Sequence, residues 1–183
     1  MRLTFGLIVS LLFAAAGCTP SDSPASAYAA FRDAVQKRDG EAAWAMHSTQ
    51  GAMAYDAMLR PLLKEQKLTA YAATTMSVPP EKFGAFNGHD FYVTAIKKAD
   101  LLSSRGFPYA VHNVVGTLGD VTLIGDDKAT APLRLPNQEL REVDFLREDG
   151  KWKIHAVRDP SKNPLARWEN VPSSSAVATN SAR

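Results

Sequence analysis

The sequence predicts an α+β domain in which N-terminal helices pack on a curved antiparallel sheet. In the first half of the chain, apolar residues recur three and four positions apart, which is the period of a helix. In the second half they alternate with polar residues, which is the period of a strand, and turn residues separate the alternating segments. Helices followed by a meander of strands are typical of the α+β class.

The first 17 residues have the layout of a secretory signal. Arg2 provides a short basic start, residues 3–16 are mostly apolar, and small residues fill positions 15–17. The apolar run is shorter than the roughly 20 residues that a membrane-spanning helix needs. We therefore expect residues 1–17 to be a signal peptide.

Cys18 is the only cysteine of the chain, and together with residues 15–17 (Ala-Ala-Gly) it resembles the lipobox of bacterial lipoproteins. The family usually has Leu where this chain has Ala15. The resemblance implies that Cys18 carries a lipid anchor and begins the mature chain, which places the protein in the bacterial cell envelope. Because Thr19 rather than Asp follows the cysteine, it also implies the outer membrane, facing the periplasm, if the host has two membranes. The alternative is an ordinary secretory signal followed by an incidental cysteine.

Three further segments follow from composition. Residues 18–26, rich in Ser, Pro and Thr, predict a lipidated cysteine with a flexible spacer. Residues 24–158 carry the periodic patterns and are expected to form the folded domain. Residues 159–183 contain three prolines and three consecutive serines, which predicts a mobile tail.

Four helices are expected in the first half of the domain, over residues 24–38, over 41–47, from position 48 or 49 onward, and over 87–102. Pro24 suits the first turn of a helix, and Ser48 or Thr49 can cap the third helix by accepting a backbone N–H. Pro61 must kink or end that helix, because proline has no N–H and its ring clashes with the preceding turn.

Four strands are expected in the second half, over residues 111–124, 129–135, 139–148 and 151–157. Gly116 and Gly119 suggest a bulge in the first strand. A turn is expected over residues 125–127. Pro132 cannot donate a ladder hydrogen bond, so the second strand should lie at a sheet edge or direct the missing N–H outward.

The dipeptide Asp149-Gly150 predicts a two-residue hairpin loop, which fixes the register of the last two strands. One face then carries the pairs Arg147–Trp152, Phe145–Ile154 and Val143–Ala156, and the other carries Leu146–Lys153, Asp144–His155 and Glu142–Val157. The first face should pack against helix residues such as Phe31 and Trp44, with Phe145 and Trp152 in the core. The second face is mixed and charged, and we expect it to be solvated.

Two stretches, AYAAFRDAVQKRDGEAAWAMHS (27–48) and VDFLREDGKWKIHAV (143–157), resemble the nuclear-transport-factor-2-like superfamily in its small bacterial lipoprotein branch. The resemblance covers residues 24–158, with a poor match over 68–110. It implies a cone of helices and bent sheet that encloses a pocket. Members include ketosteroid isomerase, polyketide cyclases and many modules that only bind or only assemble.

The best candidate for chemistry is the pair Asp144 and His155. A carboxylate beside an imidazole can orient it as a general base, but the same pair also suits an exposed cross-strand ion pair. His47 is expected at a helix end, where an imidazolium would complement the helix dipole. The histidines show no spacing typical of a metal site, and we expect neither a metal nor another cofactor.

Several apolar side chains at helical spacing could form the wall of a pocket or an ordinary core. They are Trp44, Tyr55, Met58 and Phe91, together with Met46, Met53 and Met76.

Three functions remain open from the sequence. The first is a lipid-anchored, non-enzymatic module that binds a small apolar ligand or an envelope partner. The second is an isomerase- or cyclase-type enzyme with Asp144 or His155 as base, and the third is a structural module that dimerises through its sheet. The formal net charge of +2 and the scattered basic residues argue against a nucleic-acid partner.

Overall fold

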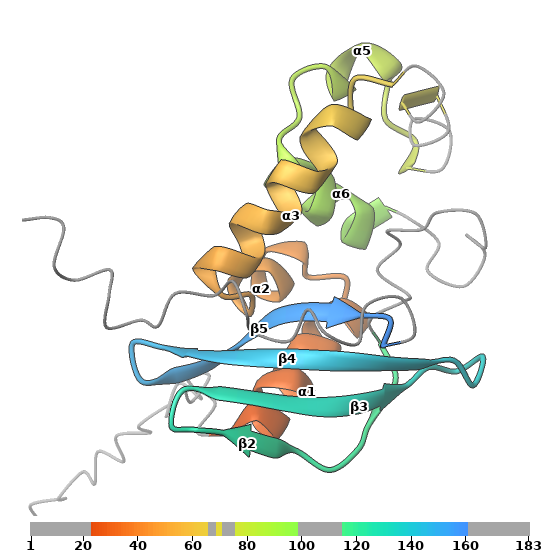
Figure 1. Cartoon of the computed structure of the whole chain (residues 1–183). Coiled ribbons are helices and arrows are strands. Elements are labelled where there is room, and N and C mark those ends of the chain that lie inside the picture. Colours follow the sequence, from red (N-terminus) through yellow and green to blue (C-terminus); the bar gives the residue numbers. More distant parts are fainter. Residues whose placement is uncertain (1–22, 66–68, 71–75, 99–114, 161–183) are drawn as a thin grey trace, which may run out of the picture.

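A computed structural model describes residues 23–65, 69–70, 76–98 and 115–160, and it has helices packed on a curled antiparallel sheet (Figure 1). The α+β prediction is therefore confirmed. The helices are α1 (Pro24–Gln36), α2 (Gly40–Ala45), α3 (Thr49–Leu62), α5 (Pro80–Phe83) and α6 (Gly88–Lys98). The strands are β1 (Thr117–Leu118), β2 (Thr122–Ile124), β3 (Lys128–Arg134), β4 (Leu140–Glu148) and β5 (Lys151–Arg158).

Side-chain caps explain where the first three helices begin. Ser23 forms a capping box with Ser26 at the start of α1, and Asp39 accepts the Ala42 N–H at the start of α2. Ser48, one of the two predicted caps, accepts the Gly51 N–H at the start of α3. Pro61 lies inside α3, one residue before its last residue, so the predicted disruption falls in the last turn of the helix.

The sheet order is β1-β3-β4-β5, and β2 also pairs with β3. The first predicted strand is thus two short strands in its described part. Pro132 lies in an interior strand, where its carbonyl accepts the Gly119 N–H at 2.8 Å. Because the N and O of a strand residue point to the same side, the missing N–H of Pro132 falls where β1 and β2 are interrupted.

The predicted hairpin register holds from the turn to the pair Phe145–Ile154 and then shifts by one residue. Asp144 lies opposite Ala156, which leaves His155 as the extra residue of a bulge. The predicted pairs Val143–Ala156, Asp144–His155 and Glu142–Val157 are therefore wrong. In their place the structure has Val143–Val157, Asp144–Ala156 and Glu142–Arg158.

The α2–α3 connection packs against β5 where the bulge occurs. The Ser48 N–H donates to the Ile154 carbonyl at 2.8 Å, and the Ile154 N–H donates to the Met46 carbonyl at 2.8 Å. A side-chain carbon on Gly51 would overlap the backbone carbonyl of His155. The first turn of α3 therefore lies directly on the β5 backbone, which only glycine permits.

The predicted core positions Phe145 and Trp152 are confirmed. Phe145 and Trp152 are buried in one cluster with Phe31, and Trp44 packs against the edge of that cluster. Helix α1 crosses the back of the sheet as seen in Figure 1, while α3, α5 and α6 extend beyond the β5 edge. The molecule thus has a helix layer on one sheet face and a second helical group beside the sheet.

The opposite face is not solvated as predicted. Asp144 is 4% exposed and Glu142 is 8% exposed. The register shift brings Arg158 beside both carboxylates, and the Thr130 hydroxyl lies within hydrogen-bond distance of both. This face therefore carries a buried polar network at its centre.

In the described part of the chain, no helix has the length and apolarity to cross a bilayer. The predicted signal peptide, Cys18, most of the spacer and the tail beyond residue 160 lie outside the described residues.

Candidate functional site

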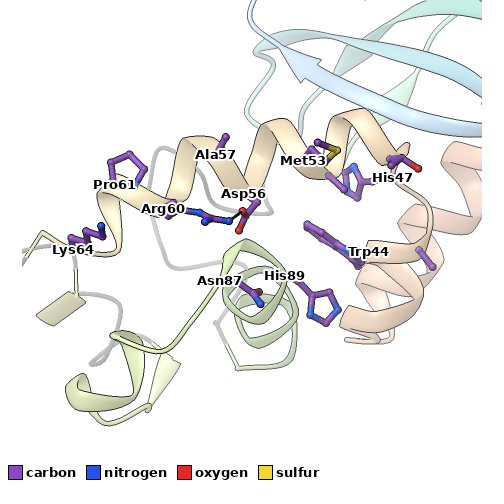
Figure 2. A pocket seen from close by; sticks show the side chains of 13 residues that line it. Trp44, His47, Met53, Asp56, Ala57, Arg60, Pro61, Lys64, Asn87 and His89 are labelled. Carbon is purple, nitrogen blue, oxygen red and sulfur yellow. Dashed lines mark hydrogen bonds and ion pairs between the residues drawn. The ribbon is translucent and has the colours of Figure 1, made fainter. Parts of the chain in front are cut away.

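A groove of about 1170 Å³ lies between α3, the end of α2 and the start of α6 (Figure 2). It is beside the β5 edge of the sheet. Its lining residues are Trp44, Ala45, His47, Thr49, Ala52, Met53, Asp56, Ala57, Arg60, Pro61, Lys64, Asn87 and His89.

Helix α3 supplies the long apolar wall of the groove. Ala52, Met53, Ala57 and Pro61 line it, and Met53 is 68% exposed. On the other side, α6 begins directly against α3, because a Cβ on Gly88 would lie 2.5 Å from the Asp56 Cα. The close approach of the two helices forms the base of the groove.

Aromatic rings form the end of the groove next to α2. The Trp44 ring packs edge-on against His89 and Tyr92, with ring centroids 5.2 Å apart in each pair. His47 Nε2 lies 2.9 Å from the Tyr92 hydroxyl. Burial, with the nearby Lys153 charge, lowers the pKa of His47 to about 4. His47 is therefore neutral near pH 7 and does not bring a positive charge to this helix end.

One carboxylate occupies the middle of the groove. Asp56 pairs with Arg60, and Asp56 Oδ1 accepts the Gly88 N–H at 2.6 Å. The Arg60 hydrogen bond, followed by the Gly88 N–H, lowers the pKa of Asp56. Asp56 is therefore ionised at neutral pH, and its charge is compensated by Arg60.

The two ends of the groove differ in charge. At the aromatic end, His89 Nε2 lies 3.0 Å from the Glu41 carboxylate, and His89 Nδ1 lies 3.5 Å from the Asp90 carboxylate. At the other end, Lys64 follows the C-cap of α3 and is exposed.

Of the predicted pocket residues, Trp44 and Met53 line this groove. Tyr55 packs against the core beside the Trp44 and Tyr92 rings, and Phe91 is fully buried in the core. Met58 is 39% exposed and lies outside the groove lining.

Four ionisable groove residues do not stand out in the sequence: Asp56, Arg60, Lys64 and His89. Positions 53, 56, 57, 60 and 64 follow helical spacing along one side of α3. That period was visible in the sequence, but nothing in it indicated that this side of the helix would remain uncovered.

The candidate pair Asp144 and His155 is separated by the bulge. Asp144 is held by Arg158 through Nε and, at 2.9 Å, through Nη2. His155 Nδ1 lies 3.0 Å from the Oγ of Ser48, which is fully buried. Burial lowers the pKa of His155, although the nearby Asp144 and Glu148 charges act in the opposite direction. Both side chains thus make contacts that stabilise the fold.

Within the described residues, no group of three or more His, Cys, Asp or Glu side chains is arranged to hold a metal ion. Comparison of the chain with protein-family models, with curated proteins and with solved structures found no match.

Proposed function

We propose that this protein is a lipid-anchored envelope protein that binds an apolar chain in the α3 groove without catalysing a reaction. The binding proposal rests on one observation, the exposed apolar wall of α3. Met53, Ala57 and Pro61 are exposed along it, beside the ring of Trp44. A bound apolar chain would remove this surface from water, at roughly 25 cal/mol per Å² buried.

The size and composition of the groove support a ligand rather than a solvent-filled crevice. Its volume of about 1170 Å³ is somewhat above the range of roughly 300–1,000 Å³ that is typical of ligand pockets, which leaves room for an extended chain. Methionine side chains adapt to irregular apolar surfaces, so Met53 suits a flexible chain.

Binding is favoured over catalysis because the polar groups of the groove already have partners. Asp56 is held by Arg60 and the Gly88 N–H, and His47 contacts the Tyr92 hydroxyl. The alternative of an isomerase- or cyclase-type enzyme loses its main support, because Asp144 is held by Arg158 and lies opposite Ala156.

The anchor and the fold family belong to the same proposal. The apolar run before Cys18 and the lipobox resemblance support lipidation. Ser23 follows Cys18 by five positions, so a lipid there would keep the start of α1 within about 18 Å of the membrane surface. The order of helices and strands supports a nuclear-transport-factor-2-like fold, in the small bacterial lipoprotein branch.

The binding proposal is tested with N-phenyl-1-naphthylamine, an uncharged fluorophore whose emission rises in apolar sites. The full chain is used with Cys18→Ser, which removes any lipid of its own. We expect Ala57→Trp, which fills the groove, to weaken binding at least ten-fold. The matched control is Ala54→Trp, an exposed alanine of the same helix that does not line the groove. Equal binding by both variants would refute the assignment of the ligand to this groove.

The anchor is tested by labelling cells with an alkyne fatty acid. We expect the wild-type chain to take up the label and to remain with membranes, and Cys18→Ser to do neither. An unlabelled wild-type chain would exclude the lipoprotein assignment.

A further inference from the structure

The charges along the groove indicate which kind of apolar ligand it would accept. We propose that the groove binds an anionic amphiphile with one long apolar chain. This proposal rests on the proposed function. The chain lies along α3, and the anionic head lies at Lys64.

The groove has the shape of an elongated ligand. Its lining includes Thr49 at the first residue of α3 and Lys64 just after its last turn. At 1.5 Å per residue this span is about 22 Å. Figure 2 shows Trp44 and Lys64 at opposite ends of the groove.

The middle of the groove disfavours an anionic head. Asp56 is ionised there, and its partner Arg60 only balances its charge. A second anion beside Asp56 would compete with it for Arg60 and would repel it. The middle of the groove therefore suits the chain better than the head.

The aromatic end also disfavours an anion. His89 lies between Glu41 and Asp90, so an incoming anion would meet two carboxylates. The Trp44 ring at this end offers apolar surface instead. This end therefore suits the tip of an apolar chain.

Lys64 is left as the site for the head. Among the lining residues that the structure describes, Lys64 is the cation without a carboxylate within ion-pairing distance. Arg60 lies one helical turn before it, and its guanidinium has donors beyond the one that contacts Asp56. One uncompensated cation at the end of an apolar wall, with spare guanidinium donors one turn away, matches a carboxylate, sulfate or phosphate head.

The first experiment compares three ligands that share a ten-carbon chain and differ in the head, each below its micelle concentration. Decanoate, decanol and decyltrimethylammonium compete with N-phenyl-1-naphthylamine on the full Cys18→Ser chain. We expect decanoate to bind about five-fold more tightly than decanol, and decyltrimethylammonium to bind most weakly. Raising the salt concentration should reduce the affinity of decanoate relative to that of decanol and leave the affinity of decanol unchanged.

The outcomes separate the two proposals. If decanol binds as well as decanoate, the head assignment is wrong while the apolar groove stands. If none of the three displaces the fluorophore and the fluorophore itself does not bind, the proposed function fails as well.

The second experiment locates the head with charge variants. Lys64→Glu should weaken decanoate at least five-fold and leave decanol unchanged. Lys98→Glu is the matched control, because Lys98 is likewise an exposed lysine at a helix end but does not line the groove. Asp56→Asn keeps an acceptor for the Gly88 N–H and releases the Arg60 charge, so it should strengthen decanoate two- to five-fold. If Lys64→Glu lowered the affinities for decanoate and decanol equally, or changed neither, the assignment of the head to Lys64 would be overturned.

Discussion

Replacing Arg158 by methionine should lower the free energy of unfolding by about 3–5 kcal/mol. The Arg158 side chain is 18% exposed, and it contacts the Asp144 and Glu142 carboxylates, whose side chains are 6% and 11% exposed. Methionine keeps most of the apolar stem but removes the charge. Two buried carboxylates would then lose the compensating charge of Arg158.

Two further variants test this reasoning. Adding Glu142→Gln to Arg158→Met should recover part of the lost stability, because one of the two carboxylates that lose the Arg158 charge becomes neutral. Lys37→Met removes the exposed Lys37–Asp33 pair on α1 and should change stability by less than about 0.5 kcal/mol.

Urea denaturation, followed by both circular dichroism and tryptophan fluorescence, measures these differences. If Arg158→Met lowered the free energy of unfolding no more than Lys37→Met, the stabilising role of the buried network would be refuted. A double variant less stable than Arg158→Met alone would show that charge repulsion is not the cause.

Two other predictions concern the packing of α3 and the His47 site. Gly51→Ala should destabilise the protein by about 1–3 kcal/mol despite the better helix propensity of alanine, because its Cβ overlaps the His155 carbonyl. Gly84→Ala, whose Cβ would meet only ordinary contacts, should be neutral or stabilising in the same urea titration. The pKa of His47, lowered to about 4, lies below its unfolded value near 6.5, so stability should fall as pH drops from about 6.5 to 4 and level off below that. NMR titration of the His47 ring measures its pKa. His47→Gln should give a flatter dependence of stability on pH, which checks that this ring is the cause. A ring that titrates near pH 6.5 would contradict both the lowered pKa and the pH dependence derived from it.

Local signals in the sequence were sufficient for most of the fold. Ser48 was predicted as a helix cap from its residue type, and Asp149-Gly150 fixed the first pairs of the hairpin, because both effects depend on a few adjacent residues. The burial of Phe145 followed from strand alternation once the turn was placed.

The bulge at His155 could not be predicted in the same way. It occurs where the start of α3 lies on β5, and Gly51 and His155 are far apart in the sequence. Beyond this point every predicted pair was one residue out of register, including Asp144–His155. The burial of Asp144 was missed for the same reason, since the shift is what brings Arg158 beside it.

The groove shows a second limit of prediction from the sequence. Apolar residues at helical spacing on α3 and α6 indicated which side chains could be buried but not which would be covered. Phe91 lies in the core, whereas Met53 remains exposed, because α6 packs against other helices and this side of α3 faces open solvent.

The contact between the α2–α3 connection and β5 joins two segments that are made at very different times during synthesis. Ser48 and His155 are 107 positions apart, and their hydrogen bond joins the first third of the domain to its last strand. Contacts between such distant residues form only after the intervening chain has been made and its loop closed. An N-terminal fragment that ends before Lys151 therefore lacks the strand on which α3 rests. The first turn of α3, where the groove wall begins, gains its contact with β5 only when the last part of the domain has emerged.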